Sequence, residues 1–512
     1  MNLAMLLDIP SMIVPDDVAL RSDDDTVTYA ELRSRVGRVA AALRSSGIGP
    51  GDRVAILATN RVAAVEVIFG AAAVGAVAVP MNFRARPNEV EHLLRDSGAK
   101  LVVAEARYEE VLRAACPTEG PEAVFIGPDF DRWRSAPEEA AEIHDVDDGA
   151  LAVLLYTSGT TSLPKGVMLT HGGLTSYVMG LVDSADGTDK GRTLLVAPLY
   201  HVAGTTSLLS SLYGGRSVVL LPQFDAGEWL ATVERERITN AFVVPTMLAR
   251  IVDEPSLRDR DLQSLEMVTY GAAPMPPAVI RRAIEAFPDT VGFSGAYGQT
   301  ETTSTVAVLT VEDHRLVGTD EEVGAKLHRL ASVGRLVDDV EARVVSESGE
   351  VLPPNAVGEV QLRTARSMAG YWGSGSERTR DTIDDQGWIH TGDLGQVDED
   401  GYLFLGGRAG DLIIRGGENV SPAEVETVLY EHPDVLEAGV VGIPDEEWGE
   451  RIAAAVVLRG ESAMDEKDML AWCAERLGGS KRPDSIAFLS QLPRTSTGKL
   501  LRRDLPSLLL HG

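Results

Sequence analysis

Short apolar runs alternate with helix-like stretches along residues 28–270, and this alternation limits the fold more than any other feature of the sequence. Thr28 and Glu31 form a capping box that predicts a helix over residues 28–45. A second helix is predicted over 62–74, and strands are predicted at 54–57, 76–79, 101–103, 124–126, 151–155, 193–197, 217–220, 241–244 and 267–270. Because strands that alternate with helices form parallel sheets with helices on their faces, the sequence predicts the α/β class.

Beyond residue 330 the apolar runs are shorter and are separated by glycine and proline. Strands predicted at 340–345, 358–362 and 402–405 indicate a small β-rich, antiparallel unit. After Asp411, a compact α+β unit is indicated by helices at 422–431 and 465–476 and by strands at 437–441, 452–458 and 485–488. Glycine and small residues at 408–411 suit a swivel. We therefore expect one domain of residues 1–410 and a second of residues 411–512.

Composition disfavours several classes of protein. The chain has 512 residues and a formal net charge of −30, so nucleic acid and an anionic membrane surface are poor partners. Its apolar start has no basic segment and is broken by Asp8 and Pro10, which predicts a first helix and not a signal peptide. No apolar run reaches transmembrane length without charges or glycines. Cys116 and Cys473 belong to no paired motif, which predicts reduced thiols in a cytoplasmic protein without a zinc site.

The loop at residues 156–166, Tyr-Thr-Ser-Gly-Thr-Thr-Ser-Leu-Pro-Lys-Gly, follows the predicted strand at 151–155. Its composition suits a polyphosphate, because glycine lets N–H groups approach an anion, hydroxyls donate to phosphate oxygens and Lys165 adds a positive charge. Pro164 stands where the Walker loop requires its second glycine, so the loop is of another kind. The alternative interpretation is a polar surface turn before a helix.

This loop resembles the phosphate-binding loop of the acyl-adenylate-forming superfamily, which contains acyl-CoA synthetases, adenylation domains and beetle luciferases. Seven further stretches resemble core motifs of that superfamily in the same order: 197–201 (Ala-Pro-Leu-Tyr-His), 271–274 (Gly-Ala-Ala-Pro), 297–301 (Tyr-Gly-Gln-Thr-Glu), 387–393 (Gly-Trp-Ile-His-Thr-Gly-Asp), 401–408, 416–419 (Gly-Gly-Glu-Asn) and 493–499 (Pro-Arg-Thr-Ser-Thr-Gly-Lys). The resemblance covers essentially the whole chain and is closest to acyl-CoA synthetases.

The resemblance implies a fold and an activity. The expected fold is α/β, with a large N-terminal domain of two α/β subdomains and a β-rich subdomain, followed by a small mobile α+β C-terminal domain. The expected enzyme is an AMP-forming acid–thiol ligase, which joins a carboxylic acid to coenzyme A through an acyl-AMP intermediate and uses ATP and Mg²⁺. A homodimer is left open.

The first half-reaction brings a carboxylate to the α-phosphate of ATP, so cations and donors must offset their repulsion. By resemblance, Lys499 bridges the two anions, Glu301 holds Mg²⁺ and Thr300 donates to the α-phosphate. A lone lysine or glutamate is more often a solvated surface residue, and the surrounding motifs favour the catalytic role. The resemblance adds Lys165 and His201 to the catalytic set, and it assigns the phosphates to Thr157, Ser158, Gly159, Thr160, Thr161 and Ser162.

The nucleotide needs a stacking surface and acceptors for its ribose. By resemblance, the ring of Tyr297 lies on adenine, Asp393 accepts from both ribose hydroxyls and Arg408 contacts the ribose–phosphate region. A core tyrosine and a turn-forming aspartate are the structural alternatives. The remaining nucleotide-binding residues implied by the resemblance are Gly271, Ala272, Ala273, Gly298 and Thr300.

The expected acyl pocket is lined by His201, Val244, Met247, Gly295 and Ala296. Small residues prevail at 292–296 (Gly-Phe-Ser-Gly-Ala), which leads to the hypothesis of a roomy pocket for a bulky or medium-to-long acyl group. No arginine is obviously placed for a second carboxylate, so malonate-type acids are disfavoured. As a lone histidine, His201 is more often structural.

For the second half-reaction, the resemblance implies that the C-terminal domain rotates about Asp411 and replaces Lys499 by the loop at 416–419. Glycines there let a thin thiol arm approach closely. The turn at 346–349 leaves no room for the insertion of fatty acyl-AMP ligases that serve carrier proteins, which favours coenzyme A as acceptor. The expected CoA-binding residues are Gly416, Gly417, Glu418, Lys481 and Arg482, and for the two cations solvated surface charge is the alternative.

Ser162 departs from the superfamily pattern, which has glycine at this position. A side chain there costs about 1 kcal/mol or more if the backbone needs positive φ or close phosphate approach. This leaves open a ligase that is weak in adenylation and acts mainly on a preformed acyl adenylate. Two alternatives from other classes are a luciferase-like oxygenase and a non-catalytic nucleotide sensor. The presence of Lys499 and Glu301 argues against the sensor.

Overall fold

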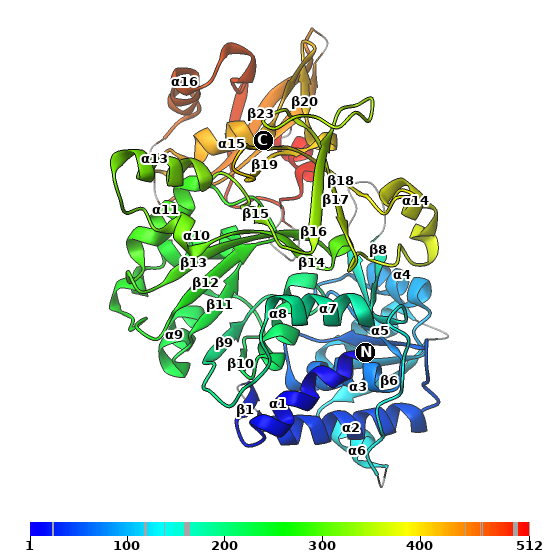
Figure 1. Ribbon diagram of the computed structural model, residues 1–512. Coiled ribbons are helices and arrows are strands. Elements are labelled where there is room, and N and C mark those ends of the chain that lie inside the picture. The colour runs from blue at the N-terminus through cyan, green and yellow to red at the C-terminus, as the bar shows by residue number, and fades with distance from the viewer. Residues whose placement is uncertain are drawn as a thin grey trace.

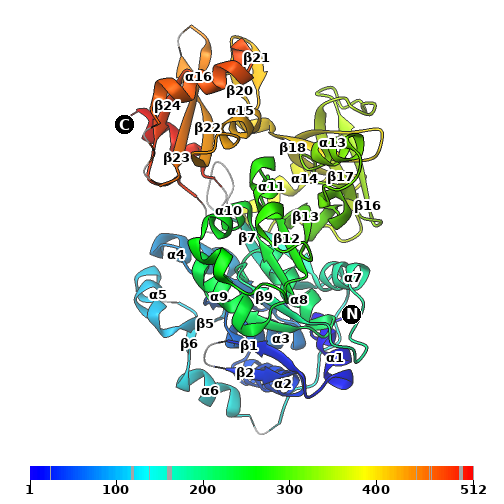
Figure 2. The same cartoon turned by 90° about the vertical axis from the view of Figure 1, so that its left-hand side faces the viewer.

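The computed structural model describes the whole chain except residues 23–24, 117–119, 138, 158–163, 446, 461, 463, 495–499 and 511–512. A large N-terminal body ends with β19 (Leu403–Arg408) and carries a small C-terminal body above it (Figures 1 and 2). The short 3-10 helix η6 (Ala409–Asp411) connects the two. The fold is α/β with a large first and a small second domain, as predicted from the sequence.

One six-stranded sheet has the strand order β6-β5-β3-β4-β7-β8. Its strands run parallel except at one edge, where β8 is antiparallel to β7. The capping box between Thr28 and Glu31 begins the first long helix, as predicted. The elements of this unit are β3 (Arg53–Leu57), β4 (Val77–Pro80), β5 (Leu101–Glu105), β6 (Glu122–Ile126), β7 (Leu151–Thr157), β8 (Lys165–Thr170), α2 (Tyr29–Ser45), α3 (Val62–Ala73), α4 (Pro87–Ser97), η2 (Ala106–Tyr108), α5 (Glu109–Ala115) and α6 (Pro128–Ser135).

A nine-stranded sheet has the order β15-β14-β13-β12-β11-β9-β10-β1-β2. Its central strands are parallel, whereas β14, β15 and β2 pair antiparallel at the edges, so the expectation of parallel sheets is wrong there. The strands are β1 (Val18–Arg21), β2 (Thr26–Thr28), β9 (Arg192–Leu195), β10 (Ser217–Leu220), β11 (Asn240–Val243), β12 (Met267–Gly271), β13 (Gly292–Gln299), β14 (Ser304–Leu309) and β15 (Arg335–Leu336). The helices are η1 (Leu3–Leu7), α1 (Asp8–Ile13), α7 (His171–Leu181), α8 (Val202–Tyr213), α9 (Ala226–Glu236), α10 (Pro245–Asp253), η3 (Pro255–Asp259), α11 (Pro277–Ala286), η4 (Thr300–Thr302), α12 (Val311–His314) and α13 (Asp320–Arg329).

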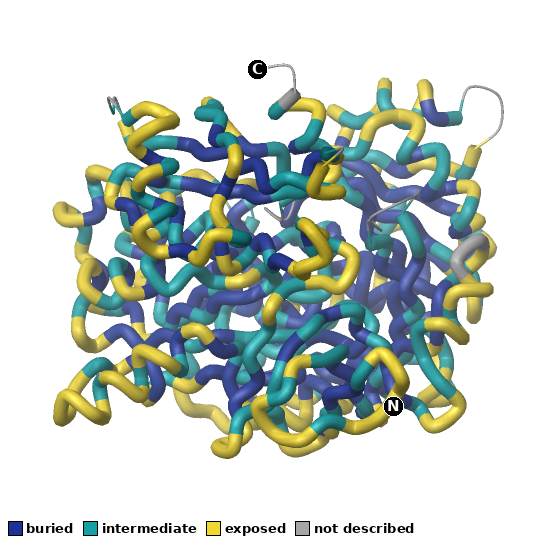
Figure 3. The backbone as a smooth tube through the Cα atoms, turned by 90° about the horizontal axis from the view of Figure 1, so that it is seen from above, coloured by how far each residue is buried: buried dark blue, intermediate teal, exposed yellow. Residues whose placement is uncertain are grey.

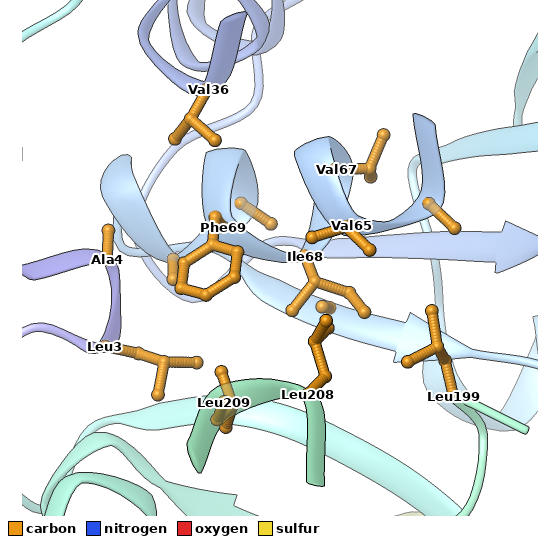
Figure 4. Close-up of a cluster of buried hydrophobic side chains, with 14 of the residues drawn as sticks. Leu3, Ala4, Val36, Val65, Val67, Ile68, Phe69, Leu199, Leu208 and Leu209 are labelled. Carbon is orange, nitrogen blue, oxygen red and sulfur yellow. The ribbon is translucent and has the colours of Figure 1, made fainter. Parts of the chain in front are cut away.

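Helix α3 lies in the core of the large body. Every residue of α3 except Ala63 is buried, which is typical of a helix that is apolar on all sides. Phe69 and Ile68 point toward Leu3 of η1 and toward Leu208 of α8 (Figure 4). Because the same apolar cluster contains residues of both sheets, this helix joins them, and truncating Phe69 to alanine would cost about 3–5 kcal/mol of stability.

The predicted β-rich unit is an antiparallel sheet of four strands in the order β16-β17-β18-β19. A small apolar cluster that includes Val306, Val360 and Leu403 packs it against the nine-stranded sheet. The unit consists of β16 (Val340–Val345), β17 (Gly358–Thr364), η5 (Gly373–Arg378), α14 (Thr379–Thr382), β18 (Ile389–Val397) and β19.

The C-terminal body is the predicted α+β unit. Its sheet has the order β21-β20-β23-β22, with β24 beside β23, and Val425, Met469 and the free thiol of Cys473 are buried against it. Figure 3 shows the molecule from above, with buried segments running through its interior and many exposed turns at its rim. None of the helices in the described part of the chain has the length and apolarity needed to cross a bilayer. The elements are β20 (Ile413–Arg415), β21 (Glu418–Val420), α15 (Pro422–Tyr430), β22 (Val435–Asp445), β23 (Gly449–Leu458), α16 (Glu466–Arg476), η7 (Gly479–Lys481), β24 (Ser485–Phe488), η8 (Arg502–Asp504) and α17 (Leu505–Leu510).

Candidate active site

Three side chains converge on the carboxylate of Asp393. Tyr297 and Gln299, both on β13, donate to its Oδ2 at 2.6 and 2.8 Å. The guanidinium of Arg408 lies 3.2 Å from Oδ1, because β18 and β19 pair the two residues in register. Burial and the charge of Asp393 raise the pKa of Tyr297 well above its ordinary value, so its hydroxyl remains a donor. Three predicted nucleotide-binding residues therefore form one cluster.

The backbone beside this cluster takes a strained course after β12. Gly271 pairs with Ala296 of β13, and a Cβ atom at Gly271 would overlap the carbonyl oxygen of Ala296. The next residue, Ala272, has φ of 67°, a left-handed conformation that costs a residue with a side chain about 1 kcal/mol or more. Such strain is common at ligand sites, and it turns Ala272 and Ala273 out of the sheet at the carboxyl end of the strand.

The turn with Thr300 and Glu301 is the 3-10 helix η4. It follows Gly298, where a Cβ atom would overlap the carbonyl oxygen of Ser304, so this glycine is required by packing whatever it binds. The carboxylate of Glu301 accepts a hydrogen bond from the hydroxyl of Tyr371 at 2.8 Å. The ammonium of Lys165 lies 5.2 Å from the centre of the Tyr371 ring. Lys165 and Glu301, which are far apart in sequence, are thus brought together.

Lys165 lies in a partly desolvated, cationic environment. Burial lowers the pKa of Lys165, the charge of Arg378 lowers it further and the charge of Glu301 opposes both effects. Arg408 in turn acts on the hydroxyl of Tyr371, so the Asp393 cluster and the Glu301 cluster are neighbours. Lys165 and Arg378 beside the carboxylate of Glu301 suit an anionic substrate with a bound metal ion, because the cations offset the charge of the anion and the carboxylate can bind the metal.

The phosphate loop connects two antiparallel strands. Thr157 ends β7 and Lys165 begins β8, and the two residues are paired in register. The alternative of a turn before a helix is wrong, because a strand follows. The predicted residues Ser158, Gly159, Thr160, Thr161 and Ser162 lie outside the described residues.

The residues expected around the acyl group lie in apolar surroundings. His201 directly precedes α8, and its ring centre is 4.4 Å from that of Tyr200, which in turn meets Phe83 edge-on. Val244 is buried directly before α10, and Met247 of α10 packs against an apolar cluster that includes Leu248 and Tyr270. This arrangement is compatible with an apolar pocket and equally with the structural role of a core.

Gly295 does not open space on its own side of β13. A Cβ atom at Gly295 would lie 3.2 Å from the ring of Tyr270 and 3.2 Å from Cβ of Leu309. Because Gly295 has no side chain, the ring of Tyr270 can occupy the space beside it. Ala296, the next residue of the strand, points to the opposite face.

The predicted hinge residue Asp411 lies in η6 between β19 and β20. Its carboxylate is 3.5 Å from the guanidinium of Arg502, which also binds Glu426 and donates to the carbonyl oxygen of Val440 at 2.7 Å. Lys499 lies outside the described residues.

The predicted CoA-binding residues meet on one side of the C-terminal body. Gly416 and Gly417, with φ of 58° and 85°, form the two-residue turn of the hairpin β20–β21, a turn that favours glycine. Glu418 is exposed directly after it. Arg415 donates to the carbonyl oxygens of Ser480 and Arg482 at 3.3 and 2.9 Å, which holds the hairpin beside η7. Lys481 pairs with Glu424 at 2.7 Å.

Ion pairs join the two bodies. Arg250 of α10 lies 3.4 Å from Glu437 of β22, and Asp253 of α10 pairs with Arg459. Arg250 and Asp253 also line a cavity of about 300 Å³ together with Leu436, and this cavity contains none of the predicted site residues.

Several residues of the site escaped prediction. Tyr371 contacts both Lys165 and Glu301, Arg378 acts on Lys165, and Arg366 is buried behind η4. Gln299 lies within the motif at 297–301, but the sequence assigns it no role. The Gly370-Tyr371-Trp372 run was the only signal for Tyr371, because its partners are remote in sequence.

The residues present fit the ligands that the motifs imply. Among the described residues, no group of three or more His, Cys, Asp and Glu could cage a metal ion. Glu301 offers a hard oxygen ligand near Lys165, and Mg²⁺ is commonly held by one or two carboxylates together with substrate phosphates. Asp393 offers acceptor oxygens for hydroxyl groups.

Known proteins are similar to the chain over nearly its whole length. Residues 13–372 match the AMP-binding enzyme family and residues 424–499 match the AMP-binding enzyme C-terminal domain. A feruloyl-CoA synthase of Amycolatopsis sp is 39% identical over 490 residues, with 95% of each chain covered. A long-chain-fatty-acid–CoA ligase of Mycobacterium tuberculosis is 35% identical over 94% of this chain and 93% of its own. Among solved structures, ATP-bound MatB from Rhodopseudomonas palustris superposes with a TM-score of 0.88 at 30% identity over 99% of both chains.

Proposed function

The chain belongs to the AMP-binding enzyme family and is an AMP-forming acid–CoA ligase, and from that premise we propose that it activates a bulky hydrophobic carboxylic acid and transfers the acyl group to coenzyme A. One observation carries the assignment of the site. The Asp393 cluster, suited to a ribose, lies beside the Lys165–Glu301 cluster, suited to phosphates, and Arg408 acts on both.

In the proposed first step, a carboxylate oxygen of the acid attacks the α-phosphorus, the bond to the bridging oxygen breaks and pyrophosphate leaves. Lys165 and Lys499 offset the negative charge that the two anions bring together, and Thr300 donates to the α-phosphate. Thr157 and the loop 158–163 contribute hydroxyl and N–H donors to the other phosphates. Glu301 would hold Mg²⁺, which supplies further positive charge to the phosphates when bound.

The nucleoside is proposed to be held by residues that are fixed before it arrives. Tyr297 cannot turn freely, because its hydroxyl is bonded to Asp393, so its ring is ready to stack on adenine. Asp393 would accept from the ribose hydroxyls, with Arg408 beside it toward the phosphate. The strained backbone of Gly271, Ala272 and Ala273 would border the base.

In the proposed second step, the thiol sulfur attacks the acyl carbonyl carbon, the bond to the oxygen of AMP breaks and the thiol proton passes to solvent. We propose that the C-terminal domain, residues 411–512, rotates about Asp411 between the steps. The rotation would bring the tight turn of Gly416 and Gly417 to the site in place of Lys499. Lys481 and Arg482 would then attract the phosphates of coenzyme A.

The nature of the acid is proposed from the surroundings of the acyl candidates. Val244 and Ala296 have apolar side chains, Met247 packs against an apolar cluster, and the ring of His201 lies beside that of Tyr200. A feruloyl group and a long-chain fatty acyl group are the substrates in the names of two similar proteins. We propose an apolar, aromatic or long-chain acid, and a cytoplasmic location in which Cys116 and Cys473 stay reduced.

The test uses purified protein with Mg²⁺-ATP and a panel of acids, with and without coenzyme A. Mass spectrometry follows acyl-AMP and acyl-CoA separately, and a parallel reaction receives synthetic acyl adenylate. Acyl-CoA from a free apolar acid is the expected result, and formation of thioester from short or dicarboxylic acids only would contradict the proposed substrate class.

The same assay with Ser162→Gly decides whether the loop limits adenylation. If the natural protein forms thioester only from the synthetic adenylate and the variant also forms it from free acid, Ser162 has weakened the first step. Equal adenylation rates of the two proteins would remove that alternative.

A further inference from the structure

A strap of five residues, 368–372, ties the base of the phosphate loop to the Glu301 turn. On one edge it pairs with β8, since the N–H of Met168 donates to the carbonyl oxygen of Gly370 at 3.0 Å and that of Trp372 donates to Gly166 at 2.8 Å. At its start, the N–H of Met368 donates to the carbonyl oxygen of Glu301 at 2.8 Å. The strap therefore connects by its backbone two segments that carry opposite charges of the site.

The side chain of Tyr371 also connects the two segments, because it contacts both Glu301 and Lys165. Its hydroxyl donates to Oε1 of Glu301 at 2.8 Å, and its ring faces the ammonium of Lys165 at 5.2 Å. The tyrosine is only 6% exposed, so water competes little with either contact. A charge-assisted hydrogen bond and a cation–π contact thus meet on one rigid ring.

Tyr371 remains a hydrogen-bond donor at neutral pH. Burial, followed by the charge of Glu301, raises the pKa of Tyr371 above its ordinary value. A protonated phenol can only donate to the carboxylate of Glu301, which fixes the direction of that carboxylate. Free rotation of the Glu301 side chain would otherwise have to be lost when a ligand binds.

We propose that Tyr371 is a positioning residue that holds the carboxylate of Glu301 and the ammonium of Lys165 at the separation required by a metal-bound triphosphate. This inference rests on the proposed function. Tyr371 engages one carboxylate oxygen of Glu301, and the cation would take the other. The residue acts through Glu301 and Lys165 and does not itself touch the reacting atoms.

The test replaces Tyr371 by phenylalanine, which keeps the ring under Lys165 and removes only the donor. Calorimetry measures binding of α,β-methylene-ATP in Mg²⁺ and, separately, in EDTA. Because a hydrogen bond to a charged group is involved, we expect binding in Mg²⁺ to weaken about tenfold or more, with binding in EDTA changed less than about twofold. Adenylation of an acid should fall by a similar factor.

Tyr402→Phe is the matched control. Tyr402 is also buried, donates to a carboxylate (Asp313, at 2.7 Å) and carries guanidinium groups on its ring, but it lies outside the site. We expect nucleotide binding to be unchanged in this variant. Equal losses in the two variants would overturn the proposal, because they would show general damage.

A double-mutant cycle with Glu301→Gln keeps the test decisive. If Tyr371 acts through Glu301, Tyr371→Phe should weaken nucleotide binding no further in the Glu301→Gln background. Independent, additive losses, or unchanged Mg²⁺-dependent binding in Tyr371→Phe, would overturn the inference. Failure of the wild-type protein to make acyl-AMP would instead contradict the proposed function, and the binding measurements would still judge the role of Tyr371.

Discussion

The hydroxyl of Tyr297 lies 2.6 Å from Oδ2 of Asp393, so the ring proposed for adenine is anchored by the carboxylate proposed for the ribose. The two residues stand 96 positions apart, on β13 of the nine-stranded sheet and on β18 of the β-rich unit. Any shift of one unit against the other would therefore separate the stacking ring from the acceptor.

Replacing Tyr297 by phenylalanine should weaken ATP use without unfolding the protein. The ring remains, and only a hydrogen bond to a charged group is lost, which predicts an increase of about tenfold in KM for ATP. The rate of ATP–pyrophosphate exchange at varied ATP checks this. Tyr177→Phe is the control, because its hydroxyl bonds to the uncharged Thr305 at 3.2 Å, and an unchanged KM in Tyr297→Phe would contradict the role of the anchor.

Removing the ion pairs that join α10 to the C-terminal body should loosen that body. The pairs Arg250–Glu437 and Asp253–Arg459 are partly exposed, so each contributes about 0.2–1 kcal/mol. The double variant Arg250→Ala/Arg459→Ala should therefore lower the equilibrium constant for this arrangement by about twofold to about thirtyfold, as measured by solution X-ray scattering. Arg113→Ala, which breaks an isolated surface pair with Glu109, should leave the scattering curve unchanged. Identical curves for all three proteins would contradict the prediction.

Arg366 should be essential for stability. Its guanidinium is 2% exposed, donates to the carbonyl oxygens of Thr302, Thr303 and Thr305 and pairs with Asp339. Loss of this group leaves buried acceptors unsatisfied beside the positive φ of Thr303 and Ser304, so Arg366→Met should cost about 3–5 kcal/mol. Unfolding by denaturant measures this loss in the free energy of unfolding. Arg363, which is also paired with a carboxylate but is partly exposed, provides the control Arg363→Met, which should leave the unfolding midpoint nearly unchanged.

His171 should make the first domain sensitive to mild acid. Its Nδ1 accepts from the N–H of Leu3 at 2.9 Å, and burial lowers the pKa of His171 to about 4. Below the ordinary histidine pKa of about 6.5 the unfolded chain binds the proton more readily, so stability falls as pH drops from about 6.5 to about 4, by up to about 3 kcal/mol. Asparagine can replace the Nδ1 acceptor without titrating. His171→Asn should thus show a shallower loss of the unfolding midpoint between pH 7 and 4.5, and parallel curves would contradict the assignment.

Local patterns predicted much of the fold because they act over a few residues. The capping box at Thr28 and the strands β16 (Val340–Val345) and β24 (Ser485–Phe488) were predicted to the residue. Strand β13 was missed because its glycines and small residues give no β signal, and its pairing depends on Tyr270 filling the space beside Gly295. Strand β8 was missed because the polar loop before it gives no sign that a strand follows. Only the antiparallel pairing with β7 reveals the strand.

The candidate site was predictable only as far as motifs extend. Asp393, Tyr297 and Arg408 were chosen by resemblance, and the structure brings these three together. The link from Tyr371 to Glu301 spans 70 positions and depends on the strap packing against β8, which no local pattern encodes. The roles of Ser162 and Lys499 stay predictions, because both residues lie outside the described part of the chain.

The return of the chain as strand β8 after the phosphate loop sets how this protein can attract an anion. Where such a loop leads into a helix, the aligned peptide dipoles of that helix contribute roughly half a positive charge that no point mutation can remove. A strand has almost no net dipole, so the full positive charges of the protein here come from side chains such as Lys165 and Arg378. The charge that attracts a triphosphate is therefore concentrated in a few replaceable residues, beside the neutral N–H and hydroxyl donors of the loop, and single substitutions can weaken or restore it.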